Sequence, residues 1–258
     1  MRRQLALAIQ MHEAAHYTLF RTRWLNETVA DWLAARPMWN DVARYREHHM
    51  RHHAHTGSET DPDLSLVRPF PTTRRSLARK FARDLAGIST VKRIIGLFLM
   101  DIGVFHYTVA AEVIRRPRDG RTRMDYVREG LRNMLPFVIM NLVFAGILAA
   151  CGILWTYWAW VAAYFTSFSL FVRIRSLAEH ACTEMSEDPL RNTRTTLASV
   201  LARMTVAPMN VNYHLEHHLL ASVPYYRLPQ MHRVLRERSG IVPATGYGEV
   251  LRLASAAG

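Results

Sequence analysis

Residues 135–172 contain no charged side chain, although charged residues make up 21% of this 258-residue chain. As a single helix, the uncharged stretch would be about 57 Å long at about 1.5 Å per residue. The hydrocarbon core of a bilayer is only about 30 Å thick, so the stretch predicts two antiparallel membrane helices rather than one. Because glycine tolerates turn conformations, the reversal is expected near Cys151 and Gly152.

The charges around this stretch predict its orientation. Its expected tip carries no charge, whereas four arginines flank its ends: Arg128, Arg132, Arg173 and Arg175. Basic residues gather on the cytoplasmic side of membrane segments, so both ends of the hairpin are expected in the cytoplasm. The chain is therefore predicted to be an integral membrane protein, of the inner membrane if bacterial, with its active site on the cytoplasmic side.

The net charge of +12 suggests an anionic partner. The sequence contains no nucleic-acid-binding motif, so nucleic acid is not expected as that partner. Segment 68–93 mixes arginine and lysine with Leu77, Phe81 and Leu85 at helical spacing, which favours a helix lying on the anionic cytoplasmic leaflet of the bilayer. An ordinary solvated basic helix is the alternative.

The rest of the chain also has the pattern of helices, without the alternation typical of strands and without an internal repeat. The expected fold is all-α, with a transmembrane hairpin at about 135–172 and a cytoplasmic helical cap that carries the functional site. No linker is evident, so residues 1–258 are expected to form a single domain. Residues 94–114 are apolar but include three ionisable side chains, which favours a half-buried interfacial helix over another membrane span.

The distribution of histidine points to function. Nine of the thirteen histidines fall in three clusters: His12 and His16; His48, His49, His52 and His53; His214, His217 and His218. Their spacings of three and four place imidazoles on one face of a helix. Packing gives no reason to gather groups that repel one another when protonated, whereas neutral imidazoles around a cation remove that conflict.

The number of histidines indicates two metal ions. A zinc site takes about three or four protein ligands, so eight or nine histidines are too many for one ion. Sites that are rich in nitrogen ligands and lack thiolates favour iron or another first-row metal over magnesium or calcium. A redox-active pair is therefore expected rather than zinc.

The first cluster also has an alternative interpretation. Residues 12–16, HEAAH, fit the H-E-x-x-H motif, in which two histidines hold zinc and the glutamate acts as the base of a metalloprotease. Membrane metalloproteases usually add an aspartate ligand from a late apolar helix, and the candidate here, Asp119, lies in a basic loop. Two further histidine clusters make this the weaker interpretation.

In these clusters and their order, the chain resembles the membrane fatty acid desaturase family, whose members carry three histidine boxes around a di-iron centre. The boxes here are HEAAH (12–16), HMRHH (49–53) and HLEHH (214–218). The family uses one further ligand upstream of the third box, where this chain has His180. The resemblance extends from about residue 10 to about residue 236.

The resemblance implies nine ligands for two iron ions: His12, His16, His49, His52, His53, His180, His214, His217 and His218. His48 is an alternative ligand, because related hydroxylases use H-x-x-x-H-H. His55 and Asp61 are expected to orient ligands by hydrogen bonds, with a solvated loop as the alternative for Asp61. Asn212 is expected to hold a ligand histidine or a metal-bound water.

The implied activity is O2-dependent insertion of a double bond into a long acyl chain carried by a lipid or a thioester. Hydroxylation by the same centre is the alternative. The sequence has no haem, iron–sulfur or flavin motif. Electrons are therefore expected from an external ferredoxin or haem protein with its reductase.

The start of the chain departs from the family pattern. Members have a membrane hairpin before the first box, whereas eleven residues precede His12 here. That segment is too short to span a bilayer. A misassigned start, a truncated sequence or a member without this hairpin is therefore expected, and a metal-binding protein without catalytic activity is a further alternative.

Overall fold

The structure is a computed structural model that describes residues 2–239 and 244–257, and it is mostly helical. In chain order the helical elements are α1 (Arg2–Ala15), η1 (Leu25–Val29), η2 (Asp31–Ala35), η3 (Arg36–Met38), α2 (Val42–His55), α3 (Leu64–Val67), α4 (Arg74–Leu85), α5 (Ile88–Asp101), α6 (Arg123–Ala150), α7 (Trp155–Phe165), α8 (Ser167–His180), α9 (Pro189–Asn192), α10 (Val200–Met204), η4 (Pro208–Asn210), α11 (His214–Leu219), α12 (Leu228–Ser239) and α13 (Tyr247–Ala254). Two very short strands, β1 (Thr196–Leu197) and β2 (Ala244–Gly246), pair in parallel, which the sequence pattern did not predict.

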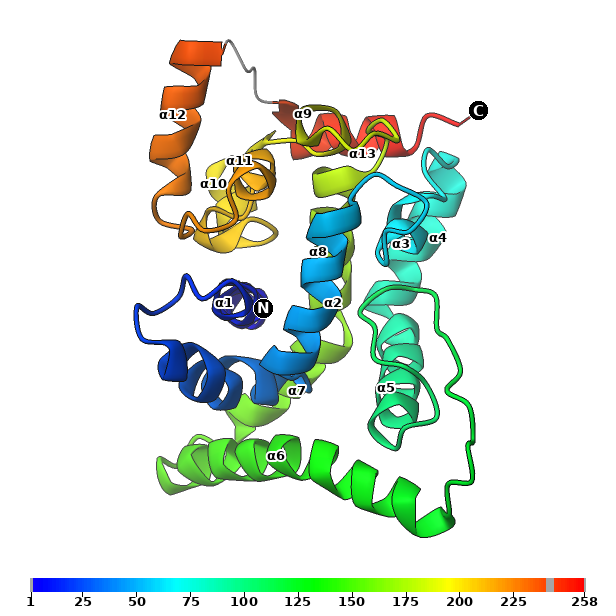
Figure 1. Cartoon of the computed structure of the whole chain (residues 1–258). Helices are drawn as coiled ribbons and strands as arrows, with labels where there is room; N and C mark the ends of the chain where they lie inside the picture. Colours follow the sequence, from blue (N-terminus) through cyan, green and yellow to red (C-terminus); the bar gives the residue numbers. More distant parts are fainter. Residues whose placement is uncertain (1, 240–243, 258) are drawn as a thin grey trace.

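Helix α8 is the central element of the fold and packs against α1, α4, α7 and α13. Figure 1 shows α2 and α8 both running from the end of the molecule that carries α6 toward the end that carries α11, α12 and α13. Leu5, Ile9 and Leu177 are almost completely inaccessible to solvent and belong to the core between these helices.

The predicted chain reversal in the uncharged stretch is confirmed. Helix α6 ends at Ala150, the chain turns at Cys151 and Gly152, and Gly152 has the positive φ of 71° that favours glycine. The second arm differs from the prediction, because α7 has 11 residues and ends at Phe165, and the backbone of Thr166 leaves the helical region. Within the described residues, α6 is the one helix long and apolar enough to cross a membrane.

Helix α4 directs part of its apolar face toward the protein, although Leu85 at its end is 49% exposed. Leu77 is buried and Phe81 packs against the same cluster, which includes Leu177 of α8 and Val250 of α13. This part of the apolar side therefore faces the protein core. The single helix expected over 68–93 is corrected, because α4 ends at Leu85 and α5 begins at Ile88. The contact of this segment with the membrane surface stays a prediction.

The helix expected over 94–114 ends earlier than predicted. Helix α5 stops at Asp101, whose fully buried carboxylate accepts hydrogen bonds from Trp39 at 2.8 Å and from Arg44 at 2.7 Å. These contacts tie the end of α5 to the start of α2. The following segment is irregular, with an isolated bridge between Phe105 and Arg115.

Helices α1 and α2, which carry the first two histidine clusters, are fixed to each other by polar contacts. Asp41 caps α2 by accepting the Arg44 N–H at 2.8 Å. Arg46 of α2 donates to the carbonyl oxygens of Ala14 and Ala15, at 3.1 and 2.9 Å, and so satisfies acceptors at the C-terminus of α1. The first two clusters are thereby held side by side.

Candidate metal centre

Four segments bring histidines to one place in the middle of the molecule: α1 with the residue directly after it, the C-terminal half of α2, the last residue of α8, and α11. Their side chains form two groups in which the possible ligand atoms all lie within 4.8 Å of one another. The first group is His12, His16, His49, His53 and His217, and the second is His52, His180, His214 and His218. All nine sequence-predicted ligands belong to these groups, and their assignment as ligands stays a prediction.

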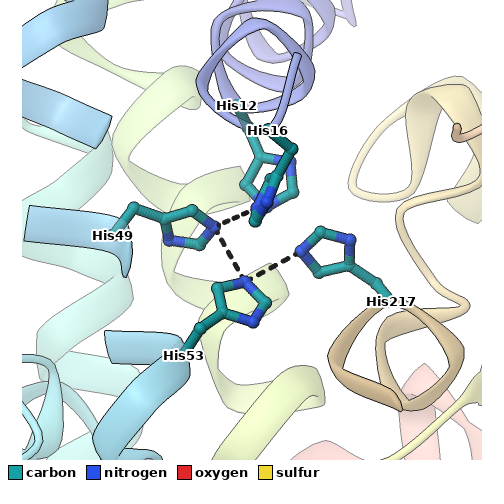
Figure 2. Close-up of side chains that lie close together, drawn as sticks. All are labelled: His12, His16, His49, His53 and His217. Carbon is teal, nitrogen blue, oxygen red and sulfur yellow. Dashed lines mark hydrogen bonds between the residues drawn. The ribbon is translucent and has the colours of Figure 1, made fainter. Parts of the chain in front are cut away.

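The ring nitrogens of the first group point toward one another, as Figure 2 shows. The Nε2 atom of His49 lies 2.9 Å from that of His16 and 3.1 Å from that of His53, which lies 3.0 Å from Nε2 of His217. Nitrogens about 2.1 Å from an ion are about 3.0 Å apart at right angles and about 3.4 Å apart in a tetrahedron. These spacings suit adjacent ligands of an ion with more than four neighbours.

The second group is arranged in the same way. Nε2 of His214 and Nε2 of His180 are 2.8 Å apart, and the His218 ring lies against His53 of the first group with centroids 4.2 Å apart. Helical periodicity explains this division, because His52 and His53 of α2 are neighbours in sequence and project about 100° apart. The two groups are therefore adjacent, with His52 and His53 of α2 on their common boundary.

Burial keeps most of these imidazoles neutral. Desolvation, reinforced by repulsion among the rings, lowers the pKa of five of them well below 6.5: His12, His49, His214, His217 and His218. The pKa of His16 is lowered to about 4 and that of His180 to about 3. Neutral imidazole is the form that binds metal, so the site is ready for cations near neutral pH.

Several buried nitrogens have no partner in the described protein. Both ring nitrogens of His12 and Nε2 of His218 are inaccessible to solvent and accept or donate no hydrogen bond. An unpartnered buried polar atom costs about 1–3 kcal/mol. A cation in each group would give one His12 nitrogen and Nε2 of His218 a partner, so the residues present fit two metal ions.

Carbonyl and carboxylate oxygens orient the second group. Asp61 lies 2.8 Å from Nδ1 of His52, and the backbone carbonyl of Asn192 lies 3.1 Å from Nδ1 of His180. A Glu179 oxygen is 3.6 Å from Nδ1 of His214. The contacts to His52 and His180 leave Nε2 free for a cation and fix the ring orientation, whereas the Glu179 oxygen lies beyond hydrogen-bond distance of His214. The role expected for Asp61 therefore has a geometric basis, whereas sequence reasoning missed Glu179 and Asn192.

His52 is the exception among the nine in its protonation. Burial lowers its pKa, but the hydrogen bond that His52 donates to Asp61 and the charges of Asp61, Asp63 and Glu179 outweigh this effect, so its pKa is raised. The second group consequently lies in a more negative environment than the first. Such an environment favours a divalent cation.

Three further sequence predictions are not supported by the geometry. His48 lies in neither group, and its Nε2 is 2.7 Å from Asp63. His55 is exposed at the end of α2, so the expected orienting role is corrected. Asn212 donates to the Thr196 carbonyl at 3.0 Å rather than to a ligand histidine, and it fixes the segment before α11.

The Glu13 carboxylate is held by hydrogen bonds within the protein. Its Oε2 atom accepts hydrogen bonds from the Thr18 hydroxyl at 2.7 Å and from the Tyr225 N–H at 3.0 Å. It thereby connects α1 to the segment that follows α11. With His12 and His16 in a five-histidine group, this contact supports a structural role for Glu13 and not that of a protease base.

A cavity of about 10 Å³, the size of one water molecule, adjoins both groups. His12 and His217 of the first group and His214 of the second line it, together with apolar side chains that include Ile9 and Leu228. Its walls are therefore mostly imidazole and hydrocarbon, and Glu13 and Tyr225 also line it.

Comparison with known proteins agrees with the pattern of clusters. The sequence profile described as fatty acid desaturase matches residues 1–245. A similar curated protein is the dihydrorhizobitoxine desaturase of Bradyrhizobium elkanii, which is 26% identical over 246 residues. The match covers 92% of this chain and 66% of that relative, so the chain spans just under two thirds of the relative's length.

Proposed function

This chain belongs to the fatty acid desaturase family, and we propose that it uses O2 and two histidine-bound iron ions to insert a double bond into a long acyl chain. The observation that carries the proposal is the convergence of nine imidazoles from four segments into one group of five and one of four. Such a donor set, with nitrogen ligands and no thiolate, suits iron.

In this proposal each group holds one iron ion. When bound, the iron pair supplies the reductive cleavage of O2 and the removal of hydrogen from an unactivated C–H bond, which no side-chain acid or base can perform. The chain contributes neutral nitrogen ligands and the oxygens that orient them. Asp61 and the Asn192 carbonyl hold His52 and His180 in place, so that the ligand nitrogens need not reorganise during the reaction.

The apolar wall of the small cavity is the proposed meeting point of substrate and histidines. Ile9 and Leu228 are almost completely buried there and exclude water from His12 and His217. A cavity of about 10 Å³ holds no acyl chain, so substrate binding requires these side chains to move apart. In this proposal the acyl chain is carried by a lipid or as a thioester.

Desaturation is favoured over hydroxylation by the name of the similar protein, a desaturase. Both reactions begin with removal of one hydrogen, and they differ in whether a second hydrogen leaves or oxygen adds to the carbon. The position of the chain relative to the histidines decides between them.

We place α6 in the bilayer and the histidine groups on its cytoplasmic side, at a bacterial inner membrane. Arg128 and Arg132 are exposed near the N-terminal end of α6 and support this orientation. Arg173 and Arg175 do not contribute to it, because they pair with Asp84 and Glu179 inside the protein.

The test is mass spectrometry of fatty acids from cells that express the chain together with a ferredoxin and its reductase. Wild type is compared with His217→Ala, which removes a first-group histidine, and with His106→Ala, whose side chain is exposed and lies in neither group. Iron content of the purified proteins is measured in parallel. We expect a product two hydrogens lighter than its precursor, and about two irons per chain, in wild type and His106→Ala but not in His217→Ala.

A product heavier by one oxygen would make the chain a hydroxylase. Bound iron without any lipid product would favour the non-catalytic alternative. A product of equal yield from wild type and His217→Ala would contradict the proposed site.

A further inference from the structure

Helix α12 presents a basic outer face. Four arginines in and just before this helix are exposed, against one exposed glutamate, Glu237: they are Arg227, Arg233, Arg236 and Arg238. Tyr226 and Val234, which are 59% and 42% exposed, lie among them. Arginine with exposed aromatic and apolar side chains is the composition typical of protein-binding surfaces.

The inner face of α12 is tied directly to the helix of the third histidine box. His232 is buried and its Nδ1 lies 2.5 Å from Oε1 of Glu216, which is completely buried on α11 between His214 and His217. The other Glu216 oxygen accepts the Thr195 hydroxyl. Leu228, at the start of α12, lines the small cavity beside the histidines. Figure 1 shows α12 along the outer edge of the molecule.

The proposed reaction requires electrons that the substrate does not supply. Conversion of –CH2–CH2– to –CH=CH– releases two electrons and two protons, whereas reduction of O2 to two waters takes up four of each. Two further electrons and two protons must therefore come from outside. A carrier protein delivers electrons most effectively where its docking surface lies closest to the metal ligands.

We propose that the outer face of α12 is the docking surface for an acidic one-electron carrier protein. This inference rests on the proposed function, since a carrier is needed only if the histidines hold a redox-active pair. Only one helix layer, α12 on α11, separates this surface from three of the nine histidines. The buried pair of His232 and Glu216 provides a hydrogen-bonded connection across that layer.

Helix α4 presents another basic surface, with exposed Arg75 and Arg79. Its contact toward the histidines is apolar, because Leu77 packs in one cluster with Leu177 of α8. It also lines no part of the cavity beside the histidines. Reversing two arginine charges on α4 is therefore a matched control for reversing two on α12.

The experiment measures the Kd of the full chain, in detergent, for an acidic plant-type [2Fe–2S] ferredoxin at low and high salt. The variants are Arg233→Glu with Arg236→Glu on α12, and Arg75→Glu with Arg79→Glu on α4. We expect the α12 pair to weaken ferredoxin binding at least about tenfold at low salt, and the α4 pair to stay within about twofold of wild type. Replacement of Arg233 and Arg236 by lysine should keep most of the binding. Unchanged iron content and Tm would show that the variants are folded.

Ferredoxin binding that is unchanged by the α12 pair, or lost in the α4 pair, would overturn the proposal. The experiment also distinguishes a wrong docking surface from a wrong proposed function. If chemically reduced protein forms the unsaturated product while the α12 pair binds ferredoxin normally, the docking surface is wrong and the function stands. If ferredoxin binds through α12 but no unsaturated product forms under any reductant, the function is wrong.

Discussion

Asp61 is the residue through which the charge of the second histidine group can be tested. Its carboxylate lies 2.8 Å from Nδ1 of His52. In Asp61→Asn the amide oxygen can still accept this hydrogen bond, so the variant removes the charge and keeps the shape. We expect affinity for one of the two metal ions to fall about 10- to 100-fold, as for other partners of ligand histidines.

This expectation is checked by Co2+ titration with stoichiometry from elemental analysis. Glu59→Gln is the control, because Glu59 is a nearby acidic residue that pairs with Arg68 at the surface. Equal affinity of both ions in Asp61→Asn and wild type would contradict the orienting role of Asp61.

The depressed histidine pKa values predict acid instability of the metal-free protein. The pKa of His16 is about 4 and that of His180 about 3 in the folded state, against 6.5 when unfolded. Below pH 6.5 the unfolded chain binds protons that the folded protein does not, so folding stability is lost as pH falls. His52 has a raised pKa and acts in the opposite direction, but it is one residue among nine.

The Tm of the metal-free protein in detergent should therefore fall steadily from pH 7 to pH 5. Loading with metal should reduce the fall near pH 7, because bound cations hold the imidazoles neutral, until acid displaces them. A Tm that is constant over this range would show that the histidines are not buried and neutral as described.

At the scale of elements, Gly57 allows two segments around the second histidine group to meet. It follows α2 with φ of +77°, and a Cβ atom there would lie 2.1 Å from the Ser186 carbonyl oxygen and 2.8 Å from Cβ of Asn192. Asn192 is the residue whose carbonyl orients His180. Gly57→Ala should therefore displace this carbonyl as well as strain the backbone.

Gly152→Ala provides the matched control, since Gly152 has φ of +71° with nothing within 4 Å of the added Cβ. We expect Gly152→Ala to lower the free energy of unfolding by about 1–2 kcal/mol from the backbone alone. Gly57→Ala should lose about a further 1–3 kcal/mol from overpacking, together with part of its metal. Denaturant unfolding and metal analysis would separate the two, and equal effects in both variants would refute the close approach at Gly57.

The histidine spacing within each helix made the histidine clusters predictable. Residues whose role depends on contacts between distant segments were missed. Positions three and four apart share a helix face whatever the fold, so the clusters could be recognised from residues such as His49 and His53. The division into a group of five and a group of four was not predicted. Glu179, Asn192 and His232 act through contacts made across the sequence, at 3.6, 3.1 and 2.5 Å. No local pattern marks such residues, because their partners are set by tertiary packing.

At the scale of the whole molecule, the reversal at Gly152 was predictable, whereas the interrupted second arm was not. Hydropathy records that residues are apolar, and it does not record whether lipid or protein covers them. Helix α8 continues the apolar stretch but packs against α1, α4 and α13 as the central helix. Arg173 likewise looked like a membrane flank in sequence but pairs with the buried carboxylate of Asp84.

Helix α6 carries the clearest prediction about the membrane. Its apolar 18-residue window has no buried residue, and Leu142 is 67% exposed in the middle of it. Placing arginine at the centre of a membrane helix costs about 3 kcal/mol in insertion. Leu142→Arg should therefore shift much of the protein from the membrane pellet to aggregated or degraded material, as measured by fractionation and alkaline extraction of expressing cells.

Leu201→Arg is the control for this substitution. Leu201 is 72% exposed on α10, which lies toward the other end of the molecule from α6 (Figure 1). The same change of side chain there meets water in the proposed arrangement, so membrane association should equal that of wild type. If both variants remain in the membrane equally well, the exposed face of α6 is covered by protein, such as a second copy of the chain, and not by lipid. If Leu201→Arg is the one that fails, the membrane lies at the α10 end and the proposed orientation is reversed.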